Sequence, residues 1–133
     1  LVMVTGGIKT EAGRNRTVPI HSRIRELVRE RYNEAIKVNR EYLFNYRDKE
    51  GRYSQITYRR YQSIVNNIKK ALNLDPDHKP HDGRAHFVTM AKEAGVDEYA
   101  IKYMVGHSIS DITERVYTTR SFDWLRSEIE KIK

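Results

Sequence analysis

The sequence predicts an α+β fold that is mostly helical, with a small antiparallel β-hairpin at the N-terminal end packed against a helical domain. Two observations predict it. Residues 1–20 place β-branched and polar residues on both sides of a glycine-containing turn, as in two paired strands. From Ser22 onward, apolar residues recur every three or four positions, which is the spacing of amphipathic helices. The length of 133 residues suits one compact domain with one core.

The first twenty residues define the hairpin. "LVMV" is apolar, "TEAG" supplies the turn with Gly13, and "RNRTVPI" alternates polar and apolar residues. Pro19 limits the second strand to an edge or to its end, because proline has no N–H to donate to a sheet. Three cations surround the turn, and they either keep an exposed edge soluble or enter a groove of DNA: Lys9, Arg14 and Arg16.

The following residues predict two helices separated by a polar stretch. The first covers residues 22–37, with Ser22 as its candidate N-cap. "EYLFNY" is a short strand or extended piece, and a polar loop surrounds Gly51. The second helix covers residues 57–72, and its apolar residues follow helical spacing: Tyr58, Tyr61, Val65, Ile68 and Leu72.

The C-terminal half predicts four shorter helices after a loop that contains two prolines. They are expected over 82–94, with Asp82 as a candidate N-cap, over 97–106, from 110 to about 117, and from 121 onward. Gly95 and Gly106 stand where the first two of these would end. The last helix has an apolar stripe made of Phe122, Leu125, Ile129 and Ile132.

The charge favours an acidic partner. Lys and Arg total 25 against 18 Asp and Glu, for a net charge of +7, which suits nucleic acid first and an anionic membrane surface second. The sequence has no cysteine, which excludes disulfides and cysteine-based zinc sites and fits a reducing compartment. It also has no apolar run of membrane-spanning length and no signal-peptide pattern. The chain begins as if in mid-strand, so we expect a fragment whose natural start lies upstream.

The segment "HDGRAHF" concentrates groups that suit phosphate. His81 and Arg84 are three residues apart at the start of a predicted helix, where free N–H groups favour anions. Arginine offers a planar fork of donors, and histidine can move a proton near neutral pH. Taken alone, the pair could equally be solvated or could cap the helix. A zinc site at His78, His81 and His86 would lack cysteine and the His-Glu-x-x-His pattern, so we expect no metal.

Two further groups are weak signals by themselves. In "VGHSISDITERVYTT", His107 follows the helix-ending Gly106, and Tyr117 comes ten residues later. The first two turns of the second predicted helix contain Arg59, Arg60 and Gln62. Arginine can read guanine and glutamine can read adenine in a major groove, although contacts to phosphate alone are an equally good interpretation.

Together, the order and spacing of these motifs resemble the C-terminal catalytic domain of tyrosine recombinases, the phage-integrase family. "IKTEAGRNRTVPI" looks like the family's lysine-bearing hairpin, and "HDGRAHFVTMAKEAGV" is similar to its histidine-x-x-arginine helix, usually written HDLRHTFAT. "VGHSISDITERVYTT" resembles its Gly-His turn followed by a nucleophilic tyrosine. The resemblance runs from about residue 3 to residue 119, nearly the whole chain.

The resemblance implies a role for each matching residue. Tyr117 would be the nucleophile, and Arg84 would hold the non-bridging oxygens of the scissile phosphate. His81 and His107 would hydrogen-bond to the phosphate and assist proton transfer. Lys9 would be the general acid for the leaving 5′ oxygen.

The sequence also departs from the family pattern. Four positions carry unusual residues, none of which removes a catalytic group: Gly83, Ala85, His86 and Val105. No Gly-x-Arg-x-x-Glu motif, which carries the family's first catalytic arginine, precedes Lys9. We therefore expect this chain alone to be inactive or very weak and the full protein to be active.

The resemblance implies site-specific recombination, such as integration or excision of a prophage or mobile element, through a 3′-phosphotyrosine intermediate and without a cofactor. The protein would act in the bacterial cytoplasm on nucleoid DNA. Its partner would be double-stranded DNA attachment sites, bound as a homotetramer through helix 121–133, although that helix would also fit packing on its own domain. A chromosome-dimer-resolving recombinase, a type IB topoisomerase, a non-catalytic DNA-binding module and a metal-dependent nuclease are the alternatives. The expected DNA contacts are Arg14, Arg16, Arg59, Arg60 and Gln62.

Overall fold

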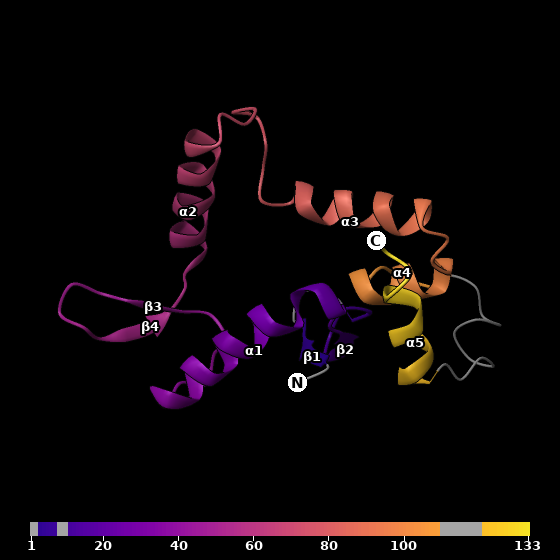
Figure 1. Cartoon of the computed structure of the whole chain (residues 1–133), viewed down its shortest axis with the longest axis horizontal. Helices are drawn as coiled ribbons and strands as arrows, with labels where there is room; N and C mark the ends of the chain where they lie inside the picture. The colour runs from indigo at the N-terminus through magenta and orange to yellow at the C-terminus, as the bar shows by residue number, and fades with distance from the viewer. Residues whose placement is uncertain (1–2, 8–10, 110–120) are drawn as a thin grey trace. The chain divides into compact units, whose positions relative to one another are not determined.

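The computed structural model describes residues 3–7, 11–109 and 121–133 (Figure 1). The chain divides into two compact units. The hairpin unit comprises Leu1–Arg25 and Arg84–Lys133, and the ribbon unit comprises Glu26–Gly83. Of the ten buried apolar residues among those described, only Ala35 belongs to the ribbon unit. Nearly all of the buried core therefore lies in the hairpin unit.

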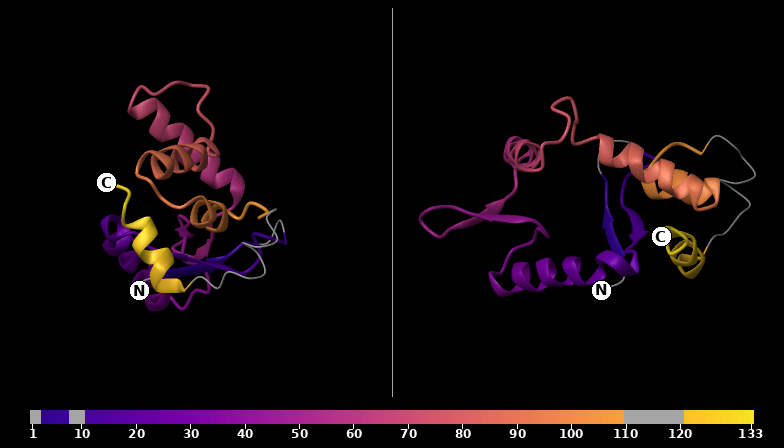
Figure 2. Two further views of the ribbon diagram at one scale, coloured as in Figure 1. Left: turned by 90° about the vertical axis from the view of Figure 1, so that its right-hand side faces the viewer. Right: turned by 45° about the horizontal axis from the view of Figure 1, so that its top comes forward.

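The hairpin unit begins with the predicted β-hairpin. Strands β1 (Met3–Gly6) and β2 (Arg16–Pro19) pair antiparallel, with Met3 opposite Pro19 and Gly6 opposite Arg16. Figure 2 shows the two strands running side by side. Pro19 is the last residue of β2, where the absence of its N–H costs no interior sheet bond.

Three helices form the core of the hairpin unit: α3 (Asp82–Glu93), whose residues from Arg84 onward belong to this unit, α4 (Glu98–Val105) and α5 (Phe122–Ile129). Side chains from all three helices and the loop between α3 and α4 form one cluster, against which Val18 of β2 packs. The buried members of the cluster are Ala91, Val96, Ala100, Ile101, Met104, Leu125 and Ile129. The bounds of all three helices agree with the sequence prediction to within a few residues.

Local signals in the sequence explain where these helices start and stop. The Asp97 carboxylate accepts hydrogen bonds from the N–H groups of Tyr99 and Ala100 at the start of α4, and the Ser121 hydroxyl accepts one from Trp124 at the start of α5. Gly95, which follows α3 closely, has a positive φ of 70°.

The C-terminal helix packs on its own unit. Leu125 and Ile129 are buried in the cluster. The Glu128 carboxylate is also buried, and it accepts hydrogen bonds from the backbone N–H of Asp97 and from the amine of Lys131, each at 2.8 Å. The sequence favoured docking of this helix on a neighbouring protomer, with packing on its own domain as the alternative. In this structure the centre of its apolar stripe, Leu125 and Ile129, packs on its own unit.

The end of the chain also fixes the start of helix α1 (Ser22–Lys37). Ser22 was the expected N-cap, but its hydroxyl donates to Glu130 at 2.6 Å. The cap is instead the imidazole Nδ1 of His21, which accepts the N–H of Arg23 at 3.0 Å while Nε2 contacts the carbonyl of Ile132 at 2.9 Å. The Ser22 hydroxyl is the main cause that holds the pKa of Glu130 below its ordinary value, and the Arg25 guanidinium adds to it.

The ribbon unit contains most of α1, a second hairpin and helix α2 (Tyr58–Ala71). Strands β3 (Asn45–Arg47) and β4 (Tyr53–Gln55) pair antiparallel around a turn in which Gly51 has a φ of 82°. The sequence predicted only a strand followed by a loop here, because three-residue polar strands show no clear alternation. Within the turn, hydrogen bonds from Arg52 hold the pKa of the Asp48 carboxyl below its ordinary value.

Helix α2 follows its prediction closely. The Thr57 hydroxyl caps it by accepting the N–H of Arg60. Its predicted apolar stripe is nevertheless largely uncovered, since Val65 is the one stripe residue that is half-buried and the exposed fractions of Ile68 and Leu72 reach 48% and 65%.

Candidate functional site

The turn that presents His107 is set by the end of α4. Gly106 adopts a left-handed conformation with φ 70° and ψ 37°. The N–H of Gly106 then bonds to the carbonyl of Tyr103 at 3.0 Å, and the N–H of His107 bonds to that of Lys102 at 2.9 Å. This paired arrangement is the common glycine-terminated end of a helix. It leaves the His107 side chain exposed, and the imidazole makes no hydrogen bond to any residue in the described part of the chain.

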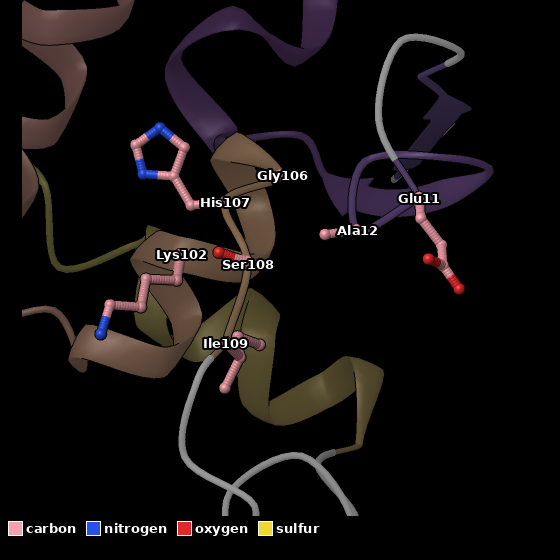
Figure 3. A pocket seen from close by; sticks show the side chains of 7 residues that line it. All are labelled: Glu11, Ala12, Lys102, Gly106, His107, Ser108 and Ile109. Carbon is pink, nitrogen blue, oxygen red and sulfur yellow. The ribbon is translucent and has the colours of Figure 1, made fainter.

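An open hollow of about 800 Å³ lies at this turn (Figure 3). It is bounded by the hairpin loop, the last turn of α4 and the residues after it, namely Glu11, Ala12, Lys102, Gly106, His107, Ser108 and Ile109. Figure 3 shows His107 and Lys102 projecting to one side of the turn and Glu11 lying on the other. The structure therefore brings the His107 turn next to the loop that contains Lys9. Lys9 and Tyr117 themselves, and the helix expected from 110, lie outside the described residues.

Arg16 joins the hairpin to this turn. Its guanidinium Nε donates to the carbonyl of Met104 at 3.0 Å, and Nη1 donates to the carbonyl of Gly13 at 2.9 Å. The N–H of Thr17 adds a bond of 3.4 Å to the hydroxyl of Tyr103. The sequence placed Arg16 among the DNA contacts, and no feature of the sequence signalled these internal bonds.

Arg84 lies on the first turn of α3 in the hairpin unit. Phe87 and Val88, on the following turn, pack against the core cluster and so anchor this helix. The Arg84 side chain is half-buried, and its guanidinium has no hydrogen bond or ion pair with the residues that the structure describes. A half-buried arginine on an anchored helix is available to an anionic ligand.

His81 immediately precedes α3 and belongs to the ribbon unit, whereas Arg84 and His107 belong to the hairpin unit. The loop before it is held by the Lys69 amine, which donates to the carbonyls of Pro76 at 2.9 Å and His78 at 2.8 Å. Asp82 is the first residue of α3 rather than its N-cap, since its carboxylate accepts the N–H of Lys79 at 2.8 Å. That bond is the main cause that holds the pKa of Asp82 below its ordinary value.

The start of α2 and the β3–β4 hairpin form a basic surface within the ribbon unit. The guanidinium of Arg60 stacks over the ring of Tyr46 with its carbon 4.4 Å from the ring centroid. Arg59 and Gln62 are exposed on the same helix. Arg59 and Arg60 line a shallow hollow of about 340 Å³ whose other lining residues are mostly polar: Tyr46, Ser54, Gln55, Thr57 and Ser63. Sequence reasoning missed Tyr46 because it did not predict this hairpin.

No group of three or more His, Cys, Asp or Glu side chains gathers in the described part of the chain in an arrangement that could hold a metal ion. None of the helices in that part is both long enough and apolar enough to cross a membrane.

Comparison with known proteins matches residues 2–123 to the phage integrase family. The chain belongs to this family. It is also 30% identical over 132 residues to tyrosine recombinase XerA of Pyrococcus horikoshii, an alignment that covers 99% of this chain but 44% of that relative. The chain thus spans less than half the length of the curated relative it matches. No solved structure matches it.

Membership of the phage integrase family confirms the resemblance read from the three motifs. The α+β architecture, with a hairpin on a mainly helical unit, is consistent with an integrase catalytic domain.

Proposed function

We propose that the full-length protein is a site-specific DNA recombinase that cleaves and rejoins DNA through a 3′-phosphotyrosine intermediate on Tyr117. The observation that carries this proposal is the presentation of His107 on a fixed, exposed turn beside the hairpin loop, in a chain of the phage integrase family. Arg84, half-buried on a helix of the same unit, supplies a planar cation for phosphate.

The proposed chemistry follows from the charge of the phosphodiester. Attack places further negative charge on its oxygens, and fixed cations and donors stabilise that charge. Arg84 would hold the non-bridging oxygens, and His81 and His107 would donate hydrogen bonds and take up the tyrosine proton. A free tyrosine has a pKa of about 10, so Tyr117 needs such surroundings to react at neutral pH.

The proposed steps balance without a cofactor. The Tyr117 oxygen bonds to phosphorus as the bond to the 5′ oxygen breaks, and Lys9 gives that oxygen a proton. Rejoining reverses the steps with a new 5′ hydroxyl, so the phosphotyrosine link conserves the energy of the broken bond.

Recognition of DNA would involve both units. Arg14, exposed on the hairpin loop, and Arg59, Arg60 and Gln62 on α2 are the proposed contacts, and Arg16 is considered separately below. The net charge of +7 supports an electrostatic attraction to DNA. We assign the substrates to attachment sites of a prophage or mobile element on nucleoid DNA in the cytoplasm.

A homotetramer on DNA remains part of the proposal. Because the centre of the α5 apolar stripe is buried against its own unit, contacts between protomers would use the exposed side of the C-terminal segment. Ser121, Asp123 and Ser127 lie on that exposed side.

Covalent capture tests the proposed function. Full-length protein is incubated with a nicked duplex that carries the element's own ends and releases the cleaved strand, and the adduct is mapped by mass spectrometry. We expect one adduct at Tyr117, unaffected by a metal chelator, and its loss in Tyr117→Phe with DNA binding retained.

Three outcomes would contradict the proposal. An adduct at another residue would displace Tyr117 from its role. Binding without any adduct would favour the non-catalytic DNA-binding module, and cleavage abolished by chelator would favour a metal-dependent nuclease.

A further inference from the structure

The Arg16 guanidinium lies where three backbone segments of the hairpin unit meet. Its Nε donates to the carbonyl of Met104 in the last turn of α4, 88 residues away in sequence. Its Nη1 donates to the carbonyl of Gly13 in the hairpin loop. The side chain is half-buried, so both bonds are partly shielded from water.

Two glycines make this close approach possible. A Cβ on Gly7 would lie 1.8 Å from the Gly13 carbonyl oxygen and 2.6 Å from Arg16 Nη1. A Cβ on Gly106 would lie 3.0 Å both from Arg16 Nη1 and from the Cα of Gly13. Gly7 and Gly106 also have positive φ values of 99° and 70°, which glycine adopts without strain.

The hairpin loop whose Gly13 carbonyl binds Arg16 also contains Lys9 in sequence. Gly7 and Asn15 close the hairpin loop through a bond of 3.2 Å from the N–H of Asn15 to the carbonyl of Gly7. Lys9 lies within this closed loop in sequence, and His107 directly follows Gly106. One guanidinium thus joins Gly13 of this loop to the last turn of α4, which leads into the turn that presents His107.

We propose that Arg16 is a positioning residue that holds the Lys9 loop against the His107 turn. This inference rests on the proposed function, because that function supplies the roles of Lys9 and His107. It differs from the expectation that Arg16 binds DNA directly, since the two donors Nε and Nη1 are directed at backbone carbonyls of the protein.

Arg16→Lys is the main test variant because it keeps the positive charge and removes the planar pair of guanidinium donors. A lysine amine can reach one carbonyl but cannot bond two carbonyls from fixed, coplanar donors. Arg23→Lys is the matched control, since Arg23 is exposed in the same unit and has no role in the proposed site. Arg14→Ala, which removes a proposed DNA contact, is the comparison for a loss of binding.

The experiment measures the single-turnover rate of covalent capture at saturating DNA and the Kd for the same duplex, using full-length protein. We expect Arg16→Lys to lower the rate about tenfold to a hundredfold, as expected for a displaced catalytic group. Its Kd should stay within about twofold of the unsubstituted protein, whereas Arg14→Ala should raise Kd. Arg23→Lys should match the unsubstituted protein in both measurements.

A second substrate separates positioning of Lys9 from a general structural defect. In it, sulfur replaces the bridging 5′ oxygen, and a thiolate leaves without a general acid because a thiol has a pKa of about 8.5. The defect of Arg16→Lys should be at least about fivefold smaller on this substrate, since general-acid catalysis is no longer needed.

Lys9→Ala makes the possible failures distinguishable. If sulfur rescues Lys9→Ala but not Arg16→Lys, the positioning inference is wrong while the proposed function stands. An increase in Kd for Arg16→Lys without a change in rate would also overturn it in favour of direct DNA contact. If the unsubstituted protein forms no adduct on either substrate, the proposed function itself fails.

Discussion

The hairpin unit and the ribbon unit differ in how firmly they hold their functional groups. The hairpin unit buries a continuous cluster from α3, α4 and α5 and places His107 and Arg84 on elements anchored to it. The ribbon unit has one buried apolar residue, Ala35, and its helix α2 leaves most of its stripe exposed. Groups that must meet a developing charge need fixed positions, whereas groups that contact a long DNA surface tolerate adjustment. On this difference we propose that most of the phosphate chemistry, His81 excepted, belongs to the hairpin unit and much of the DNA recognition to the ribbon unit.

The largest effect on stability should come from cutting the core of the hairpin unit. Leu125→Ala removes a side chain that is 5% exposed, and we expect a loss of about 3 kcal/mol. Leu72→Ala makes the same chemical change at a residue that is 65% exposed, and we expect a change within about 0.5 kcal/mol. Chemical denaturation of the chain measures both. Equal losses of unfolding free energy would show that Leu72 contributes as much to stability as a buried core residue does.

A smaller effect should come from the link between α5 and the start of α1. Glu130 accepts hydrogen bonds from Ser22 and Arg25, and its pKa lies below the ordinary value of 4.5. A lowered folded-state pKa stabilises the fold above the unfolded-state value, and this contribution is lost as pH falls through the folded-state value. We expect Glu130→Gln to cost about 0.5–1 kcal/mol at pH 7, because the site is partly exposed.

The pH dependence distinguishes this charge effect from a general defect. The difference between Glu130→Gln and the unsubstituted chain should shrink as pH drops below about 4.5, as followed by denaturation at several pH values. A difference that stays constant down to pH 3 would mean that the carboxylate charge contributes nothing.

The smallest effect is expected at Gly83, which stands at the leucine position of the HDLRHTFAT pattern that this segment resembles. A Cβ at Gly83 meets no atom within 4 Å, and the residue is helical. Gly83→Ala should therefore stabilise the chain by about 0.5 kcal/mol through the lower helix propensity of glycine. The midpoint of thermal unfolding measures this change, and a decrease would indicate that the backbone at Gly83 needs glycine for another reason.

Local patterns explain which features the sequence could predict. Helix bounds followed from periodicity together with short-range caps such as Thr57, Asp97 and Ser121. The motifs around His81, Arg84 and His107 were recognisable because their residue types and order are specific in combination. These features depend on neighbours within a few residues.

The features that the sequence did not predict depend on unusual local chemistry or on distant residues. The β3–β4 hairpin was missed because each strand has three residues and carries polar groups. The cap on α1 is the imidazole of His21, while the serine next to it bonds to Glu130 at the far end of the chain. The bond from Arg16 to Met104 joins residues 88 positions apart, so charge alone suggested a DNA contact.

The proposed roles, phosphate chemistry in the hairpin unit and DNA recognition in the ribbon unit, are tested most directly by comparing Arg84→Ala with Arg59→Ala in the full-length protein. Single-turnover capture rate at saturating DNA and Kd are measured on the same duplex. We predict that Arg84→Ala lowers the rate by about 10²–10³-fold with Kd within about threefold, by analogy with loss of one donor to a developing oxyanion. Arg59→Ala should instead raise Kd by about fivefold or more. These roles of the two units would be contradicted if Arg84→Ala weakened binding while retaining its rate, or if both variants lost rate and affinity in the same proportion.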